Sequence, residues 1–471
     1  MAGIRQFDRS IPGATAPLGR SDNYPRSVAS RLGAEPARAV LEVAGGQGPQ
    51  HLVTELAGVI ADGRSEVALV FGSEASSTTR HLAGAPDRPD WAERVGGQLE
   101  DRGHGLEGLL TRYQLVHGLT DAPSRYALLE HARRGARGQR RGEYLLEMGR
   151  LFAPFTRVAA ANPHAAAPTV RTAEELATPT GRNRLIADPY PRMLVARDLV
   201  NQGAAVLLMS VQAAERLGVA RDRRVFLHGH ADLRERALLE RRDLGACPAA
   251  VMAVEHALAQ AGVGLGDLGT IDLYSCFPVA VSAACDGLGL APDDPRGLTV
   301  TGGLPFFGGP GNNYSMHAIA ETVLRLRARP GAFGLVGANG GILSRYSVGV
   351  YSTTPAPWPP GTGAPLQAEI DSWPAPDQAV EADGWARVET YTVRYGRDGA
   401  TGIVVGRLAD GRRFLARTGD GDEETLGALT GADPLGARLF VRSFGFGNRV
   451  ATTRTLMDRL QPSPPAVLAD D

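Results

Sequence analysis

The sequence predicts an α/β fold, in which a layered body is followed by a small antiparallel β-barrel. Apolar, strand-like runs alternate with helical ones between about residues 39 and 355, which favours a mixed sheet covered by helices. A stretch rich in Pro and Gly, residues 356–365, ends this pattern. Short alternating strands follow, and residues 402–418 read as a hairpin that turns at Asp410 and Gly411. Such a series of short strands indicates an OB-like barrel.

The chain has 471 residues, more than one hydrophobic core usually accommodates. We therefore expect several domains. They are a first half of the body at residues 1–230 with a helical, Arg-rich insertion at about 85–180, a second half at 231–355, a linker at 356–365 and the barrel at 366–471.

The elements of the body are read from the period of the apolar residues. Residues 1–36 show little periodicity and are expected to form a loop with a short helix at 27–32. The run at 66–71 predicts a buried strand, after which Gly72 is expected to open a helix. The other expected strands are 39–43, 204–209 and 224–229, and the other expected helices are 49–61, 144–152, 211–218, 248–261 and one that begins near Pro278.

Composition excludes several classes of function. The sequence contains no lysine, so its 50 cationic residues are all arginine, and enzymes that need a Schiff-base or P-loop lysine are excluded. A formal net charge of -1 gives no case for binding nucleic acid. No run of apolar residues is long enough to span a membrane, and three cysteines without paired spacing favour a reducing, cytoplasmic location.

Three turns that carry unusual residues each follow an apolar strand. In an open α/β sheet, strand ends are where ligands meet the protein. The turns contain Tyr274-Ser275-Cys276-Phe277, then Gly308-Gly309-Pro310 with Asn312 and Asn313, and finally Ala338-Asn339-Gly340-Gly341.

The order of these turns resembles the C-terminal half of the thiolase superfamily. It is most similar to thiolase-like proteins of type 1, which carry an additional C-terminal domain. The resemblance implies an α-β-α-β-α body of two similar halves and an acyltransferase, similar to acetyl-CoA acetyltransferase, that acts on acyl-CoA in lipid metabolism. Coenzyme A would be part of the substrate, with no separate cofactor. A homodimer and a partner enzyme are also implied, and the alternative is a catalytically silent acyl-CoA-binding or scaffold protein.

The sequence departs from the thiolase pattern at the residues that carry its chemistry. Gly46 and Ala338 stand where the family has its two cysteines, and the loop at Gly308 lacks the family histidine. Tyr274 takes the place of a histidine in the related turn. Little room is left before the turn at Gly46, so we expect either a misplaced gene start or a first sheet without its leading strand.

The candidate catalytic residues are Cys276, His317, Asn312 and Asn339. Cys276 precedes a helix whose dipole would lower the pKa of its thiol, and His317 would act as the base. Asn312 would donate to an oxyanion. The alternatives are that Cys276 is a buried, inert residue and that His317 only caps its helix. The candidate substrate-binding residues are Tyr274, Asn313, Gly308 and Gly340.

Two further patterns are weaker. His228 and His230 share a strand face, but no third ligand is evident nearby, so no metal is predicted. The glycines at 45, 46 and 48 lack the third glycine of a dinucleotide fingerprint and are better explained as a tight turn.

Overall fold

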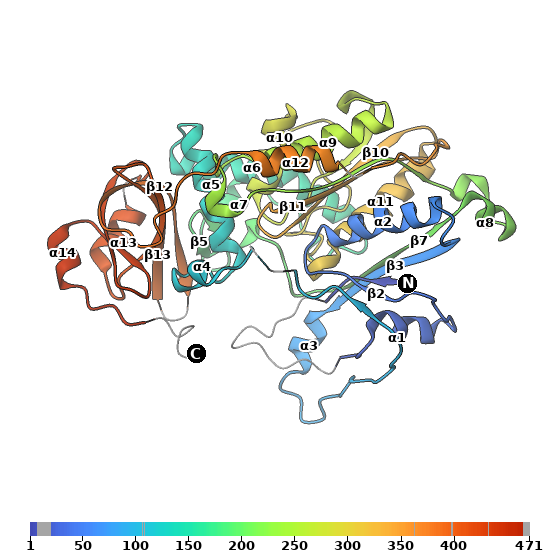
Figure 1. Ribbon diagram of the computed structural model, residues 1–471, viewed down its shortest axis with the longest axis horizontal. Helices are drawn as coiled ribbons and strands as arrows, with labels where there is room; N and C mark the ends of the chain where they lie inside the picture. Colours follow the sequence, from blue (N-terminus) through green and yellow to red (C-terminus); the bar gives the residue numbers. More distant parts are fainter. Residues whose placement is uncertain are drawn as a thin grey trace.

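The structure is a computed structural model that describes residues 1–6, 20–105, 107, 109–361, 363–396, 399–431 and 433–464. It consists of the expected α/β body and a barrel beside it (Figure 1). The barrel lies on the left of Figure 1, and the two sheets of the body extend to the right.

The first sheet has five strands, parallel except for the last. In spatial order they are β4 (Glu100–Asp101), β2 (Val40–Leu41), β1 (Ala2–Gly3), β3 (Val67–Ala75) and β7 (Asn201–Met209). Ala2 pairs with Val40 on one side and with Val70 on the other. The expectation that the first sheet lacks a leading strand is therefore wrong. Two residues are too few to show a strand period, which is why the sequence pattern missed them.

The second sheet has four strands, of which β9 and β10 are parallel. In spatial order they are β8 (Phe226–Arg234), β11 (Arg345–Ser352), β10 (Phe333–Gly340) and β9 (Leu268–Asp272). The strand expected at 224–229 extends further, across residue 230, where the boundary between the two halves was placed. The domain boundaries stay predictions.

Two helices, α2 (Gly48–Ala61) and α11 (Tyr314–Ala328), lie between the two sheets and contact strands of both. The outer face of the second sheet is covered by α9 (Pro248–Ala261), while α1 (Tyr24–Arg31) packs on the first sheet. Helices and sheets thus alternate in five layers, which confirms the α-β-α-β-α prediction. Burial of apolar residues on both sheets stabilises this central helix layer.

The helix expected at Gly72 is absent, because β3 continues to Ala75 and α3 (Ser76–Leu82) begins only after it. Gly72 pairs with Ala204 in β7. A Cβ at Gly72 would lie 2.5 Å from Asn313 Cγ, so the glycine permits close packing rather than opening a helix.

The insertion is helical, as expected. Its helices are α4 (Arg112–Val116), α5 (Ala122–Ala136), α6 (Arg141–Ala161) and α7 (Ala173–Ala177). The helix predicted at 144–152 is thus longer at both ends. α5 contacts both α10 (Pro278–Leu288) of the body and β12 (Gly384–Gly396) of the barrel, so it lies between these two parts.

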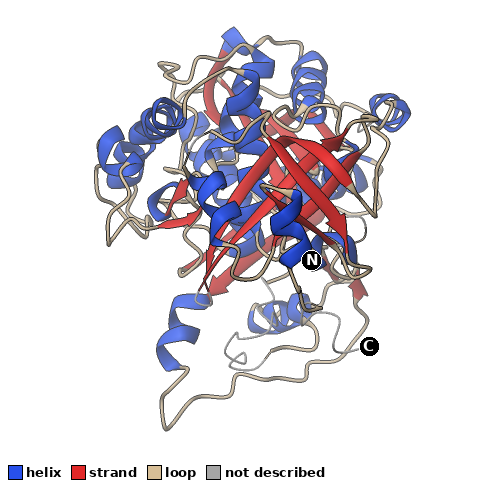
Figure 2. Ribbon diagram, turned by 90° about the vertical axis from the view of Figure 1, so that its left-hand side faces the viewer, coloured by secondary structure: helices blue, strands red, loops and turns tan. Residues whose placement is uncertain are grey.

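The C-terminal domain is a closed five-stranded barrel in the OB-like arrangement. Around the barrel the strands are β12, β13 (Gly399–Leu408), β14 (Arg413–Thr418), β16 (Asn448–Ala451) and β15 (Arg438–Ser443), which returns to β12. One pair, β14 and β16, is parallel. Figure 2 views the molecule from the barrel side. A small hairpin of the body, β5 (Leu185–Ala187) and β6 (Tyr190–Pro191), continues the sheet beyond β12.

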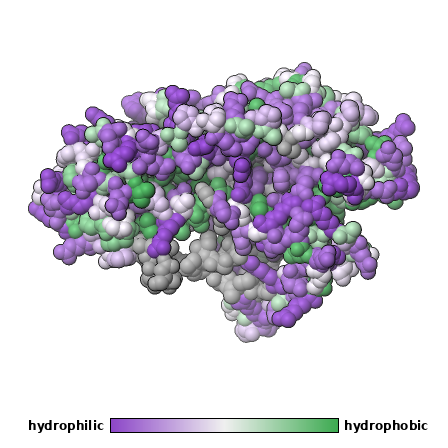
Figure 3. All heavy atoms as spheres, viewed as in Figure 1, coloured by the Kyte–Doolittle hydropathy of each residue, from purple (hydrophilic) through white to green (hydrophobic). Residues whose placement is uncertain are grey.

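The remaining helices are short. They are α8 (Val211–Arg216), α12 (Ala364–Ser372), α13 (Glu423–Thr430), which lies between β14 and β15 in the chain, and α14 (Arg454–Arg459). None of the described helices has both the length and the apolar composition that crossing a membrane requires. The face of the molecule in Figure 3 is mostly hydrophilic, with apolar residues in small groups.

Candidate functional site

The turns at Gly46, Tyr274 and Asn339 meet at the N-terminal end of α2. A Cβ added at Gly46 would overlap the phenol oxygen of Tyr274 and would lie 2.6 Å from the carbonyl oxygen of Asn339. Three segments that are far apart in the sequence therefore lie in direct contact. We call the residues at these turns, together with Cys276 and Gly340, the turn cluster.

The loop that follows Gly308 joins the turn cluster from α11. Asn312 Oδ1 accepts a hydrogen bond from the backbone N–H of Gly45 at 2.9 Å. The hydroxyl of Ser315 donates to the carbonyl oxygen of Gly46 at 2.6 Å. Gly308 itself has a φ of +132°, and a Cβ there would lie 2.5 Å from Gln202 Oε1, so a side chain is excluded.

The amide groups of both asparagines in this loop hold the backbone. Asn312 Nδ2 donates to the carbonyl oxygen of Arg5 at 2.8 Å, and Asn313 Nδ2 donates to that of Gly72 at 2.7 Å. Each amide nitrogen has two N–H donors, of which one is thus engaged in holding the backbone. The role toward an oxyanion would fall to the second N–H and stays a prediction.

Gly340 is required by the close approach of Gln47, the residue before α2. A Cβ at Gly340 would overlap the side-chain amide of Gln47. Gln47 is buried, and its Oε1 has no hydrogen-bond partner among the described residues. This packing leaves no room for a side chain at position 340, where the expected site has a glycine.

Cys276 is buried beside Asn339. Asn339 Nδ2 lies 3.7 Å from Cys276 Sγ and 2.7 Å from Tyr126 Oη. Burial raises the pKa of the Cys276 thiol to about 12, although a hydrogen bond with Tyr126 partly opposes this. The expectation that the helix dipole would lower the pKa of Cys276 is wrong, since desolvation outweighs it.

A buried carboxylate already occupies the N-terminus of the helix that follows Cys276. Glu130 Oε2 accepts a hydrogen bond from the backbone N–H of Val279 at 2.8 Å, in the first turn of α10. The hydroxyl of Tyr190 donates to the same carboxylate at 2.7 Å. The positive end of the α10 dipole is therefore compensated by Glu130 rather than by a Cys276 thiolate.

Tyr126 and Glu130 were missed by the sequence reasoning. They lie one turn apart on α5, in the segment interpreted as an insertion, where no thiolase motif pointed to them. Their spacing of four residues, which places both side chains on one face of α5, was the available signal. Tyr126 also donates to the carbonyl oxygen of Gly341 at 3.0 Å, which ties α5 to the third turn.

His317 lies on α11, where its ring meets Phe307 edge-on at 5.2 Å between centroids. Burial lowers its pKa to about 4, and His164 adds to this shift, so the imidazole is neutral at pH 7. Among the described residues, no hydrogen bond or ring contact joins His317 to Cys276. The pairing of the expected base with the expected nucleophile therefore stays a prediction.

Tyr274 is the polar group nearest to the position where the family has its first cysteine. Its ring is buried and meets that of Tyr314 edge-on at 5.3 Å. Burial raises the pKa of the Tyr274 phenol well above its usual range. No hydrogen bond joins this hydroxyl to another described residue.

A cavity of about 350 Å³ lies next to the turn cluster and is rich in arginine. Arg182, Arg192 and Arg197 line it, and their exposed side chains form no ion pair with a described residue. Burial and the neighbouring Arg192 lower the pKa of Arg197, while Asp198 partly opposes the shift. The cavity is also lined by Ala196, whose N–H donates to the carbonyl oxygen of Cys276 at 3.0 Å.

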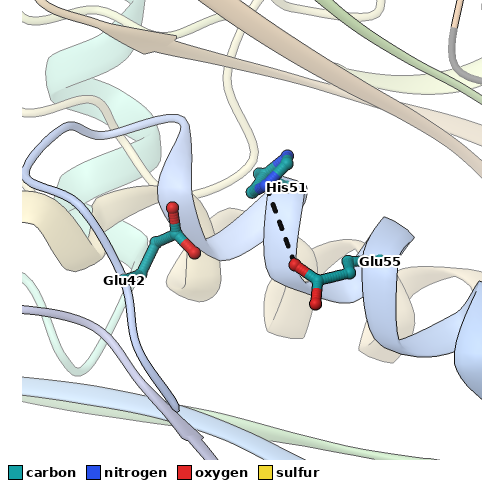
Figure 4. A group of neighbouring side chains, drawn as sticks. All are labelled: Glu42, His51 and Glu55. Atoms are coloured by element: carbon teal, nitrogen blue, oxygen red, sulfur yellow. Dashed lines mark ion pairs between the residues drawn. The ribbon is translucent and has the colours of Figure 1, made fainter. Parts of the chain in front are cut away.

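Glu42, His51 and Glu55 point toward one another beside α2 and could hold a metal ion by their spacing (Figure 4). Arg102 Nη1 lies 2.7 Å from a carboxylate oxygen of Glu42 and equally close to one of Glu55. Burial lowers the pKa of His51, but Asp232 and these two glutamates raise it by a larger amount. The resulting pKa is about 9. Two cationic side chains therefore already balance the carboxylates here.

The histidines at 228 and 230 hold the segment that follows β11. His228 Nε2 donates to the carbonyl oxygen of Thr354 at 2.7 Å, and His230 Nε2 donates to that of Pro359 at 3.0 Å. His230 also stacks on Trp358, with ring centroids 4.6 Å apart. These contacts fasten residues 354–359 to β8, which explains why both histidines lie on this strand.

Comparisons with known proteins agree with this architecture. Residues 365–445 match the family model described as the thiolase-like protein type 1 additional C-terminal domain. The crystal structure of a monomeric SCP2-thiolase like protein type 1 (STLP1) from Mycobacterium smegmatis is 51% identical and has a TM-score of 0.83. The match covers 96% of this chain and 88% of that one.

A more distant likeness concerns the fold alone. The Ltp2-ChsH2(DUF35) aldolase is 19% identical with a TM-score of 0.54, over 74% of this chain and 86% of that one. No curated protein matches the sequence.

Proposed function

Because the chain belongs to the SCP2-thiolase-like protein type 1 family, we propose that it binds an acyl-CoA thioester without performing two-cysteine thiolysis. The observation that carries this proposal is the arginine-lined cavity beside the turn cluster. Coenzyme A carries phosphate groups at one end and the thioester at the other, so its site needs cations next to a strand-end cluster. One hydrogen bond, from the N–H of Ala196 to the carbonyl oxygen of Cys276, joins the lining of the cavity to the turn cluster.

The arginines supply the phosphate end of the proposed site. A guanidinium group presents a planar fork of donors that suits phosphate oxygens. Arg192 and Arg197 are close enough to each other for one to lower the pKa of the other, and an anion between them would relieve this repulsion. Asp198 lies on the same rim and raises the pKa of Arg197, so the anion must compete with its charge.

The turn cluster would face the thioester end. Gly46 and Ala338 offer no sulfur, and Cys276 is protonated because its pKa is about 12. Non-covalent binding by a protein that works with a partner enzyme therefore fits the geometry better than catalysis. The distant structural likeness is itself an assembly of two proteins, which supports a partner. The cytoplasm, where CoA thioesters and reduced cysteines coexist, is the location that we propose.

Acyl transfer through Cys276 is the second candidate. One observation favours it: Asn339 Nδ2 lies 3.7 Å from Cys276 Sγ and would stabilise a thiolate once it formed. The proton would have to leave to solvent or substrate, because His317 does not contact Cys276. Incubation with acetyl-CoA followed by peptide mass spectrometry would detect an acyl adduct on Cys276 if this candidate is right.

Calorimetry with CoA and acetyl-CoA tests the primary proposal. The doubly substituted variant Arg192→Gln/Arg197→Gln should weaken binding by at least tenfold, since each lost charged hydrogen bond contributes about 1.5–3 kcal/mol. Arg221→Gln is the matched control, because Arg221 is an exposed arginine away from the cavity. Absence of binding at millimolar CoA would refute the proposal, and equal affinity of all variants would refute the assignment to this cavity.

A further inference from the structure

Arg449, in β16 of the barrel, is a buried cation without a counter-ion. Its side chain has no exposed surface. Nη1 donates to the carbonyl oxygen of Asn448 at 3.1 Å, but Nε and Nη2 are buried without a partner among the described residues. Burial lowers the pKa of Arg449 to about 10, and Arg417 contributes to the shift. An uncompensated buried charge is expensive, and native proteins usually pair it.

Two further arginines stand in register with Arg449 on neighbouring strands. Arg417 of β14 and Arg442 of β15 are its cross-strand partners. Cross-strand partners project from the same face of a sheet. This is the outer face of the barrel, because Ala416, Val441 and Val450, which alternate with the arginines, belong to the barrel core.

The three arginines of this row differ in their ion pairs. Arg417 pairs with Asp420 at 3.0 Å, and Arg442 pairs with Asp458 at 2.8 Å. Arg449, between them, has no acidic partner among the described residues. In addition, Nε of Arg417 is buried and unpaired. Arg442 also lies 3.9 Å from Asp383, so three acids accompany the three arginines, but none of them forms an ion pair with Arg449. The row therefore has several unused N–H donors at its centre.

We propose that Arg449 and Arg417 bind a compact oxyanion, a phosphate or a carboxylate group. Two adjacent guanidinium groups offer the bidentate donors that such anions accept. An oxyanion would accept hydrogen bonds from Nε and Nη2 of Arg449, which have no partner among the described residues.

The surroundings favour an anion over a second cation. His117, at the end of α4, accepts a hydrogen bond from the N–H of Asn448 at 2.7 Å. Burial lowers its pKa to about 4, so this imidazole is neutral and adds no further positive charge beside the arginine. A Cβ at Gly447 would lie 3.4 Å from Arg449 Nη1, so the backbone of this turn passes close to the guanidinium.

The turn between β15 and β16 covers the site. Phe446 lies over the Arg449 guanidinium, 5.4 Å from its carbon to the ring centroid. Gly445 and Gly447, on either side of Phe446, have φ of +78° and +139°. Glycine at such φ values gives the turn backbone freedom, so an anion enters when Phe446 moves aside.

Thermal unfolding in phosphate and in acetate, at an ionic strength held constant with chloride, tests the proposal. The unfolding midpoint of the wild type should rise saturably by several degrees with one or both anions, because a ligand that binds the native state stabilises it. Arg449→Gln should abolish the saturable rise. The matched control is Arg438→Gln, which removes an exposed arginine from the same face of β15. A response to phosphate alone identifies a phosphate site, and a response to acetate identifies a carboxylate site.

Two results would overturn the proposal. An equal rise in Arg449→Gln would show a general salt effect, since phosphate also stabilises proteins by exclusion from their surfaces. Absence of any saturable rise in the wild type would show that Arg449 binds no such anion. Phe446→Ala provides a second test that keeps both arginines. It should move half-saturation to a lower anion concentration, and an unchanged concentration would contradict the covering role of the turn.

Discussion

Gly46 and Tyr274 fill one space in the turn cluster. The phenol of Tyr274 occupies the volume into which any side chain at position 46 would project. The loss of the family's first cysteine and the presence of a tyrosine in place of a histidine are thus a single structural fact. Restoring a nucleophile at position 46 would first require the phenol to leave.

We expect Gly46→Ala to reduce the free energy of unfolding by about 1–3 kcal/mol, the usual cost of overpacking. In a Tyr274→Ala background the same change should cost less, because the overlap with the ring is removed while that with Asn339 remains. Urea unfolding of the four proteins measures this coupling. Gly58→Ala on α2 is the control, since a Cβ there meets nothing closer than 3.5 Å. Purely additive effects would contradict the shared space.

The three cysteines should resist alkylation in the native protein. Burial raises the pKa of Cys247, Cys276 and Cys285 to about 12 in each case. At pH 8 the thiolate fraction is then about a thousandfold below that of an ordinary thiol. Iodoacetamide labelling with mass spectrometry should therefore modify all three only after unfolding. Rapid labelling of Cys276 alone would instead restore it as a candidate nucleophile.

At the scale of elements, α2 is fastened to the second sheet by His51. Its Nδ1 lies 3.1 Å from Asp232 Oδ1 on β8, and its Nε2 lies 3.9 Å from Glu55, one turn further along α2. The N-terminus of the same helix forms part of the turn cluster. The ion pair therefore helps to place Gly46 relative to the strands of the second sheet.

This contact predicts a pH dependence. The pKa of His51 is about 9 in the folded protein and about 6.5 when unfolded, so the folded state retains its proton more tightly. Its contribution is fully present below pH 6.5 and is lost as the pH rises through 9. Because His51 is partly exposed, we expect only about 1 kcal/mol after solvent screening. Unfolding measured from pH 6 to 10 should show this loss in the wild type and not in His51→Gln. Identical profiles would contradict the role of His51.

The sequence pattern predicted long helices well. It predicted poorly those features that are very short or that depend on contacts between distant segments. α9 and α2 were predicted within one residue because their apolar period extends over several turns. β1 was missed because a pair of residues has no period. At the site, glycines and motif residues could be located, and the structure does bring Tyr274, Cys276 and Asn339 together. Burial, which the motif does not reveal, keeps Cys276 protonated.

At the scale of the molecule, β4 closes one edge of the first sheet. Its Glu100 pairs with Arg38 at 2.7 Å and with Arg102 at 2.7 Å, all within one chain. A short, charged edge strand discourages pairing with a second copy. The relative from Mycobacterium smegmatis is likewise described as monomeric.

The homodimer implied by the thiolase resemblance stays untested, and we expect a monomer instead. Sedimentation equilibrium at micromolar concentration should give the mass of one chain. Glu100→Gln removes one charge from this edge and should remain monomeric. If it dimerises, the charge of Glu100 alone prevents pairing of the edges. A wild-type protein with twice the chain mass would contradict this reading of β4.

The barrel and the body are joined by a fully buried arginine. Arg413, on β14, donates through Nη1 to the carbonyl oxygens of Leu239 and Arg241 in the body, at 2.8 and 2.6 Å. Its Nη2 donates to Glu389 of β12 at 2.6 Å. One side chain thus connects two barrel strands with the segment that precedes α9. The two parts should therefore unfold together.

Arg413→Ala should separate these two parts. It removes a buried ion pair and leaves two carbonyl oxygens without their donor, which we expect to cost about 3–5 kcal/mol. Glu389 keeps Arg407 as a partner at 3.0 Å, so the loss falls mainly on the junction rather than inside the barrel. Differential scanning calorimetry should show one transition for the wild type and two for the variant, the first at a lower temperature. Arg412→Ala removes an exposed neighbour and should leave the single transition in place. If Arg413→Ala also unfolds in one transition at the wild-type temperature, the junction is held by other contacts, of which the Arg134–Asp433 ion pair would be the next to test.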